Sequence, residues 1–180
     1  MSEARHVYDP GQRAFHWLMA AMIFVALGLG VWAHTMAPGT PLRVQLLFFH
    51  KSLGMFALAL LPLRAVWRLV KGAPPYRAPL APHVRVASHL AHAALYALMA
   101  ALPIAGYVSS GAGGHDLPFF GLFHWPLVVS VDKALSKAGD VAHYWLAWAA
   151  ALVIALHLAA VGWHQWIRRD EVLGRMARAR

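Results

Sequence analysis

The chain has 180 residues, of which 60% are hydrophobic and only 13% are charged, and this composition excludes an ordinary water-soluble domain. The net charge of +9 does not indicate a nucleic-acid partner, because the basic residues lie in the gaps between long apolar runs, as in membrane proteins. The absence of cysteine excludes disulfides, iron–sulfur clusters, thiol catalysis and haem attached through a C-x-x-C-H motif.

Four apolar stretches are long enough to cross a bilayer, which needs roughly 20 residues. Three contain no charged residue, and the other is interrupted only by Lys51. The first stretch is expected to stay in the mature protein, because it is long, contains His16 and lacks a small-residue cleavage site. The sequence therefore predicts an all-α integral membrane four-helix bundle, forming one domain over residues 1–180. The predicted helices are 14–36, 44–70, 86–110 and 140–167.

Prolines and apolar residues distinguish the predicted loops. Pro38 and Pro41 are expected to end the first helix. The loop before the third helix is expected to contain four prolines, Pro74, Pro75, Pro79 and Pro82. The loop 111–139 contains an apolar segment from Phe119 to Val129, which we expect to lie on the membrane surface.

Loop charges predict the orientation, because an even number of spans places both ends of the chain on one side. Twelve of the 16 Lys and Arg residues fall on that side. The positive-inside rule therefore predicts that both termini and the loop 71–85 are cytoplasmic, with 37–43 and 111–139 outside. The four basic residues expected on the outer side are Arg43, Lys51, Lys133 and Lys137.

An imidazole inside the bilayer needs a partner, and we expect this of four histidines in the predicted spans, which are His16, His50, His143 and His157. His143 and His157 are 14 residues apart, which turns a helix through about 1400°, so their rings leave nearly the same face about 21 Å apart. That distance suits two centres stacked across the membrane. Depth pairs His157 with His16 in the cytoplasmic half, and His143 with His50 in the outer half.

Two imidazoles on facing helices can hold zinc, copper or haem iron. Without cysteine or an intramembrane carboxylate such a site is poor for zinc or non-haem iron, whereas two axial histidines satisfy a b-type haem. We therefore expect two b-type haems; the alternative is a transporter without haem, whose histidines only pack. Gly28, Gly30 and Gly54 either let a flat macrocycle approach the backbone or pack helices together.

Three further histidines lie toward the cytoplasmic ends of the predicted spans. His89 and His92 either face lipid headgroups or contact haem propionates or a quinone. His164, seven residues beyond His157 on nearly the same face, is a candidate for quinone or proton handling.

The order and spacing of several short motifs resemble the bacterial cytochrome b561 family, from about Tyr8 to Met176. The resemblance implies a small di-haem protein of the bacterial inner membrane, with haem ligation by the same four histidines and electron exchange with ubiquinone near the cytoplasmic side. In the best-understood members the donor is periplasmic superoxide, so the resemblance implies a superoxide:ubiquinone oxidoreductase. The motifs are Phe15-His16-Trp17, Phe49-His50-Lys51-Ser52-Leu53-Gly54, His89-x-x-His92 with Tyr96, Leu102-Pro103-Ile104-Ala105-Gly106, the His143/His157 pair and Leu173-Gly174-Arg175-Met176.

The resemblance suggests roles for charged residues at the outer and inner ends of the predicted bundle. Lys51 and Lys137, with Arg43 nearby, either steer superoxide to the outer haem or serve as interface anchors. At the inner end, Arg85 joins His89, His92 and His164 as a candidate contact for quinone or haem propionate, or as a proton donor.

A second function of a different class fits the same fold. The chain would then be the cytochrome b anchor subunit that links a periplasmic hydrogenase, a dehydrogenase or a soluble cytochrome to the quinone pool. The apolar segment Phe119 to Val129 would serve as the docking surface for that redox partner.

Overall fold

The computed structural model describes residues 6–76 and 80–177. Arg5, Arg77, Pro79, Arg178 and Arg180, which belong to the predicted loops and termini, lie outside the described residues.

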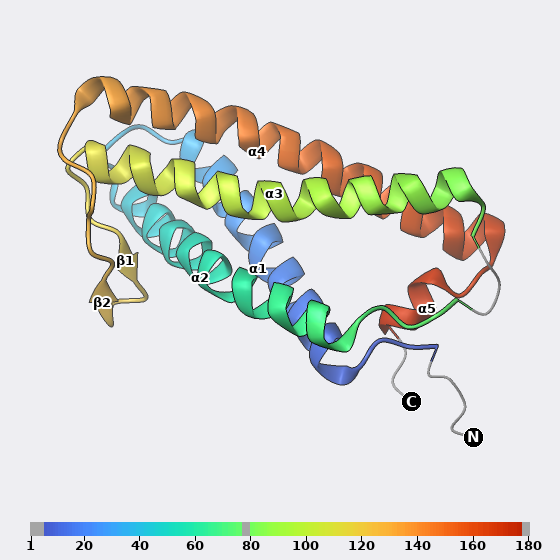
Figure 1. Cartoon of the computed structure of the whole chain (residues 1–180). Coiled ribbons are helices and arrows are strands. Elements are labelled where there is room, and N and C mark those ends of the chain that lie inside the picture. Colours follow the sequence, from blue (N-terminus) through green and yellow to red (C-terminus); the bar gives the residue numbers. More distant parts are fainter. Residues whose placement is uncertain (1–5, 77–79, 178–180) are drawn as a thin grey trace.

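Four long helices form the body of the molecule (Figure 1). Each is long and apolar enough to cross a membrane, which confirms the predicted helical membrane bundle. A single turn of π-helix, η1, continues the last of them, and a short helix, α5, follows. Two strands form an antiparallel hairpin between α3 and α4. The elements are α1 (Pro10–His34), α2 (Pro41–Lys71), α3 (Pro82–Ala112), β1 (Pro118–Phe119), β2 (Phe123–His124), α4 (Lys133–Gly162), η1 (Trp163–Arg168) and α5 (Val172–Ala177).

The residues at their starts explain why all four long helices begin earlier than predicted. Pro10, Pro41 and Pro82 each open a helix, at a position where the backbone N–H has no helical partner to lose. The predictions that Pro41 ends the first helix and that Pro82 lies in a loop were therefore wrong. Helix α4 begins at Lys133 because the Asp132 carboxylate accepts a hydrogen bond from the Leu135 amide, at 3.0 Å.

The long helices pack as two pairs. Helix α1 packs mainly against α2, and α3 mainly against α4, while the contact between α2 and α3 is smaller. The pairs lie close at the end that carries the hairpin and diverge toward the end that carries α5 (Figure 1). Few side chains are fully buried, and large apolar ones such as Leu69 and Trp145 point outward, as expected of a surface that faces lipid.

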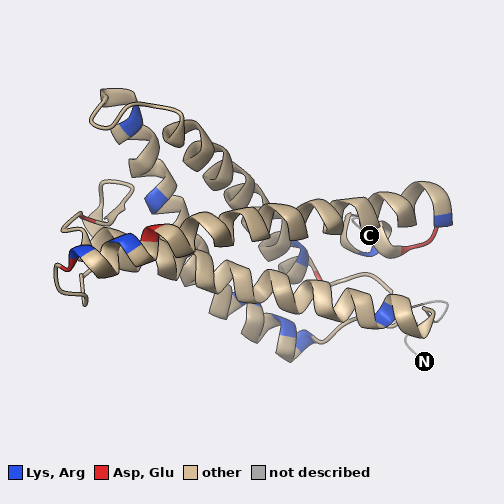
Figure 2. Ribbon diagram, turned by 90° about the horizontal axis from the view of Figure 1, so that it is seen from above, with Lys and Arg blue, Asp and Glu red and all other residues tan. Residues whose placement is uncertain are grey.

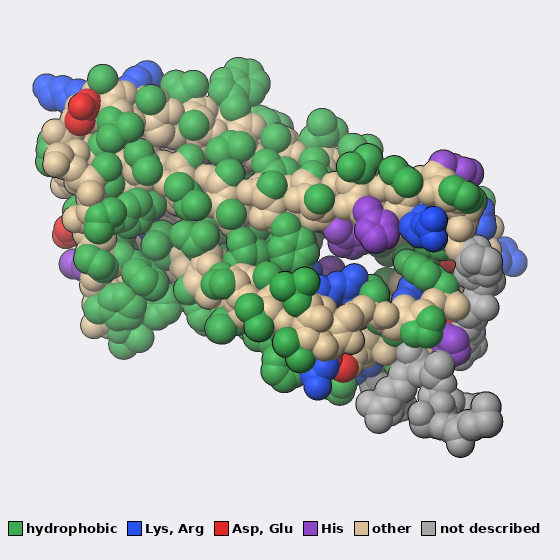
Figure 3. All heavy atoms as spheres, in the orientation of Figure 1, with side chains coloured by type: hydrophobic (Ala, Val, Ile, Leu, Met, Phe, Trp, Pro, Cys, Tyr) green, Lys and Arg blue, Asp and Glu red, His purple; other side chains and the backbone are tan. Residues whose placement is uncertain are grey.

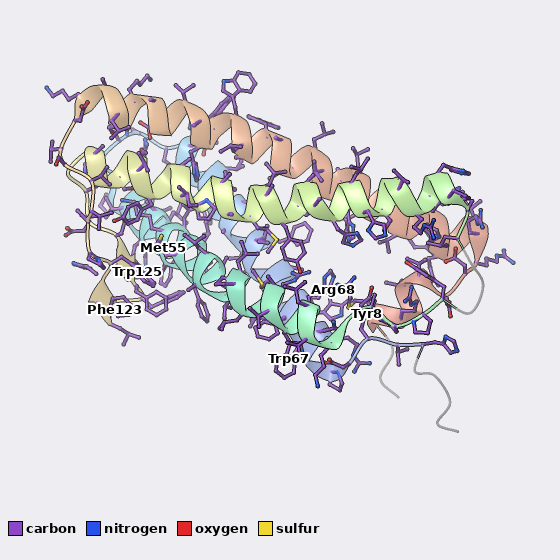
Figure 4. The ribbon with its side chains drawn as sticks, viewed as in Figure 1. Tyr8, Met55, Trp67, Arg68, Phe123 and Trp125 are labelled. Atoms are coloured by element: carbon purple, nitrogen blue, oxygen red, sulfur yellow. The ribbon has the colours of Figure 1, made fainter. Side chains whose placement is uncertain are left out.

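The hairpin end holds the apolar segment that was expected to lie on the membrane surface. Here it folds against α2: the rings of Phe119 and Phe120 lie 5.7 and 6.3 Å from that of Phe56. The fully buried Ser52 hydroxyl accepts a hydrogen bond from the Phe120 amide, at 3.0 Å. Figure 4 shows Phe123 and Trp125 on this hairpin beside α2.

At the opposite end, buried Arg175 of α5 joins the two ends of the chain. Its Nε donates to the His6 carbonyl at 3.2 Å, and its carbonyl accepts from the Tyr8 amide at 3.0 Å. Its guanidinium also lies over the Tyr76 ring, 3.6 Å from the centroid. Both described ends of the chain therefore lie at the same end of the bundle, as an even number of spans requires. Figure 2 shows most Lys and Arg toward the ends of the long helices.

Candidate functional site

Each long helix carries two residues of interest that are 14 positions apart, which is close to four helical turns. We call the four nearer the hairpin the outer layer and the four nearer α5 the inner layer. The outer layer is Gly30 of α1, His50 of α2, Gly106 of α3 and His143 of α4. The inner layer is His16 of α1, Arg64 of α2, His92 of α3 and His157 of α4.

The outer layer brings together the predicted pair His50 and His143. Their ring centroids are 5.8 Å apart and their planes are 80° from parallel. A metal–imidazole bond is about 2 Å long, so two rings on opposite sides of one metal atom have centroids roughly 6 Å apart. The spacing therefore fits a single metal atom held by both histidines.

Hydrogen bonds leave the distal nitrogen of each ring free to bind a metal. The Nδ1 of His50 lies 2.8 Å from the Ala26 carbonyl oxygen, and the Nδ1 of His143 lies 2.9 Å from the Leu102 carbonyl oxygen. A carbonyl oxygen only accepts, so each Nδ1 carries the proton and donates. Each Nε2 then keeps its lone pair, which is how metal-binding histidines are oriented in proteins.

Glycine makes room for both rings. A Cβ at Gly30 would lie 2.9 Å from the Cε1 of His50, and a Cβ at Gly106 would lie 2.9 Å from the Nδ1 of His143. Each glycine lies four residues after the carbonyl that accepts from the ring. The two helix pairs thus hold their histidines in the same way.

This arrangement distinguishes the glycines that the sequence had grouped together. Gly28 and Gly54 have nothing within 4 Å of an added Cβ, whereas Gly30 contacts His50. Gly106, which was only part of a motif, has the same role on the other helix pair.

The inner layer is arranged differently. His157 lies against His92, with ring centroids 5.6 Å apart and planes 80° from parallel. The Nδ1 of His16 lies 3.2 Å from the Nη2 of Arg64. His16 is also close enough to His157 and His92 for electrostatic interaction. The predicted partners His16 and His157 are therefore neighbours, but each makes its direct contact with a residue of its own helix pair.

The helix pairs leave an opening at the level where they diverge. Figure 3 shows a gap between them, bordered by histidine and basic side chains. At the outer level, by contrast, His50 and His143 bridge the two pairs directly.

The two lysines predicted at the outer end lie in different settings. The Nζ of Lys51 donates to the Asp116 carbonyl at 3.2 Å, which links α2 to the loop before the hairpin. Lys137 lines a hollow of about 380 Å³ with His115 and Asp140, and Lys51 is not among its lining residues.

At the inner end, the structure supplies His164 with a partner that the sequence did not suggest. The ring is buried, and its Nδ1 lies 2.5 Å from the Oδ2 of Asp170. The chain turns back at Arg169, which adopts the left-handed conformation with φ 51°, and this turn brings the carboxylate to the ring. Asp170 also lines a hollow of about 450 Å³, together with Gln165, Trp166 and Arg169.

Two other candidates at that end are exposed. Arg85 and His89 lie on α3 near its start. No group of three or more His, Asp or Glu side chains converges to hold a metal ion among the residues that the structure describes. The donors suited to a metal are thus paired histidines.

A membrane bundle with paired histidines between its helices has the features of a membrane cytochrome of the b type, in which two axial imidazoles hold each haem. Comparison with known proteins identifies the family. Residues 7–179 match the family model described as prokaryotic cytochrome b561. The chain belongs to this family.

Two curated relatives align with nearly the whole chain. It is 31% identical over 163 residues to "Cytochrome b561 homolog 2" of Escherichia coli (strain K12), and the alignment covers 91% of this chain and 87% of the relative. It is 28% identical over 172 residues to "Probable superoxide oxidase CybB" of Yersinia pestis, and this alignment covers 94% of each protein. The protein is therefore a membrane electron-transfer protein of a family that binds b-type haem, and the outer layer has suitable donors and room for their rings.

Proposed function

We propose that the chain binds two b-type haems in the bacterial inner membrane, one through His50 and His143 and one through His16 and His157, and couples superoxide oxidation at the outer end to ubiquinone reduction at the inner end. The observation that carries the proposal is the outer pair, whose rings are 5.8 Å apart with both Nδ1 atoms hydrogen-bonded to backbone carbonyls. A haem held by two histidines supplies one-electron transfer without an open coordination position.

The packing favours His16 over His92 as the partner of His157. His50 and His143 belong to different helix pairs, and so do His16 and His157. His92 and His157 belong to the same pair, α3 and α4, whose close packing leaves little room for a macrocycle between them. The divergence of the two pairs leaves an opening between them, on the side of α4 that faces the other pair (Figure 3).

At the outer end, positive charge favours an anionic donor. Lys51 directly follows His50, and its ammonium is held by the Asp116 carbonyl. An ammonium beside the outer histidine attracts a small anion such as superoxide. Two superoxide ions release two electrons and become two molecules of dioxygen. The name of the Yersinia pestis relative, a probable superoxide oxidase, supports this choice of donor.

At the inner end, His164 is suited to proton transfer. Reduction of one ubiquinone to its quinol takes up two electrons and two protons. The Asp170 carboxylate accepts from the Nδ1–H of His164, which fixes the ring and leaves Nε2 to exchange a proton with a substrate oxygen. Arg85 and His89 remain candidates for contacts to the quinone.

The direction of electron flow depends on the orientation of the chain. The excess of Lys and Arg in the loops at the α5 end supports a cytoplasmic location for that end. The hairpin, Lys51 and the outer layer would then lie on the periplasmic side.

Superoxide reduction of the purified protein tests this function. Oxidised protein in detergent would be exposed to enzymatically generated superoxide, and its visible bands followed with and without superoxide dismutase. We expect rapid reduction that the dismutase abolishes, followed by reoxidation on addition of ubiquinone. In the His164→Ala variant, reduction by superoxide should persist and reoxidation by quinone should slow.

The exposed outer loop supports a second candidate, the anchor subunit of a larger redox complex. Leu122 and Val128 are 78% and 85% exposed at the hairpin end, where a periplasmic protein would dock. Haem bands that stay oxidised in superoxide would favour this function over superoxide oxidation.

A further inference from the structure

Arg64 is a cation inside the membrane-spanning helix α2, and it has no anionic partner among the described residues. Its guanidinium contacts the His16 ring, lies 4.0 Å from the Sδ of Met19 and is 5.4 Å from the centroid of Tyr96. No carboxylate in residues 6–76 or 80–177 forms an ion pair with it. Arginine stays protonated in proteins, and an unpaired charge at membrane depth is costly. The position therefore calls for an anion that the described chain does not supply.

The hydrogen bond between Arg64 and His16 cannot persist when His16 binds iron. Arginine only donates hydrogen bonds, so the Nδ1 of His16 must accept the one from Arg64. If a neutral His16 binds iron through Nε2, its Nδ1 carries the proton and cannot accept. If His16 binds iron through Nδ1, the lone pair is already used. In either case, ligation by His16 releases the guanidinium of Arg64.

We propose that Arg64 then binds a propionate carboxylate of the inner haem. This assignment rests on the proposed function, in which His16 and His157 hold that haem. A guanidinium presents paired N–H donors that match a carboxylate, and the pair is strongest where water is excluded. Arg64 would then pair with the propionate instead of His16. The outer layer contains only glycine and histidine at the corresponding positions, so it offers no such cation.

Haem release from the full-length protein tests the assignment. The variants are Arg64→Gln and Arg64→Lys. The matched control is Arg68→Gln, one turn further along α2, where the guanidinium lies 5.0 Å from the Tyr8 ring instead (Figure 4). Each protein would be loaded with haem b or with its dimethyl ester, which has no carboxylates. Transfer to excess apomyoglobin is then followed, and the His157→Ala variant identifies the inner-site phase.

We expect Arg64→Gln to speed release of haem b from the inner site by about tenfold or more, the effect of losing one charge-assisted hydrogen-bonded pair. Arg64→Lys should have a smaller effect, and Arg68→Gln none. With the dimethyl ester, wild type and Arg64→Gln should release at the same rate.

Two results would overturn the role of Arg64 and leave the proposed function intact. One is that haem b leaves Arg64→Gln and Arg68→Gln at the same rate. The other is that Arg64→Gln accelerates the release of haem b and of its dimethyl ester equally, which would indicate a structural role. A wild-type chain that holds no inner haem would overturn the proposed function as well.

Discussion

Helical periodicity places the residues of both layers. A spacing of 14 residues returns to within roughly 40° of the same helix face, about 21 Å along the axis. The two layers follow from this spacing on all four long helices. Because the outer positions of α1 and α3 are glycine, the histidines of α2 and α4 can each pack against a neighbouring backbone.

Gly106→Ala tests the fit of the outer histidine ring. The new Cβ would lie 2.9 Å from the Nδ1 of His143, so the ring must shift and its bond to the Leu102 carbonyl must weaken. We expect haem affinity at the outer site to fall at least about tenfold, the equivalent of one displaced hydrogen bond. Gly28→Ala is the control, because nothing lies within 4 Å of its Cβ. Equal haem-to-protein ratios in the two variants would contradict the role of Gly106.

Substitution of His16 and of His92 separates the two possible partners of His157. We expect His16→Ala to lose one haem per chain and His92→Ala to retain both, because only His16 belongs to the other helix pair. Haem content measured against protein concentration gives the answer. Loss of a haem in His92→Ala with retention in His16→Ala would assign the ligand to α3 instead.

The sequence analysis did not assign Arg64 and Asp170 to the site, although the spacing of Arg64 indicated its position. Arg64 is 14 residues from His50, so the periodicity that linked His143 to His157 also places Arg64 in the inner layer. The loop charge count treated it only as a cytoplasmic charge. Asp170 left no comparable signal, because its contact with His164 depends on the turn at Arg169.

Hydrogen bonds to the capping residue determine where a helix such as α1 begins. The Asp9 carboxylate caps α1 by accepting from the Gln12 amide at 3.0 Å, and it also accepts from the Trp67 indole of α2 at 3.2 Å. Burial alone would raise the pKa of Asp9. Hydrogen bonds from the Gln12 and Gly11 amides and the Trp67 indole, together with the charge of Lys71, outweigh burial and hold that pKa below its ordinary value.

This cap predicts a pH-dependent contribution to stability. Because the folded-state pKa of Asp9 is lowered, its ionised form stabilises the fold above the ordinary value of about 3.9, and this contribution disappears as the pH falls through the folded value. Asp9→Ala should cost about 1 kcal/mol at neutral pH. Asp9→Asn keeps an acceptor without the charge, so its thermal unfolding in detergent should approach that of wild type as the pH is lowered. A stability difference that stays constant with pH would contradict the role of the charge.

The packing of the hairpin against α2 could not be predicted from the sequence. Hydropathy identified the segment Phe119 to Val129 as apolar, but not its folding against α2. That packing depends on Ser52 and Phe56, which are distant in the sequence. Long helices, in contrast, were predicted because each has its own apolar length, and their ends differed mainly where a proline or aspartate starts a helix.

The whole molecule consists of two helix pairs that meet at the outer end and diverge at the inner end. The sequence predicted four helices and which histidines share a level, because both follow from length and periodicity along single helices. It did not predict the divergence, since contacts between helices depend on side-chain packing. The direct contacts of the inner layer were unpredictable for the same reason.

The orientation can be tested with single cysteines, because the chain has none. Ala37→Cys lies in the loop between α1 and α2, and Ala73→Cys in the loop between α2 and α3; both positions are exposed. In spheroplasts, a membrane-impermeant maleimide should label the first and reach the second only after lysis, as the positive-inside rule predicts. The reverse pattern would place the hairpin end in the cytoplasm.

The most direct test of the two-layer site is the number of haems per chain in wild type and in two variants, His143→Ala and His157→Ala, each purified from haem-replete cells. One histidine from each layer is removed in turn, while the rest of α4 is unchanged. We predict two b-type haems in wild type and one in each variant, with different spectra because different haems remain. A single haem in wild type, or loss of the same haem in both variants, would contradict two stacked sites.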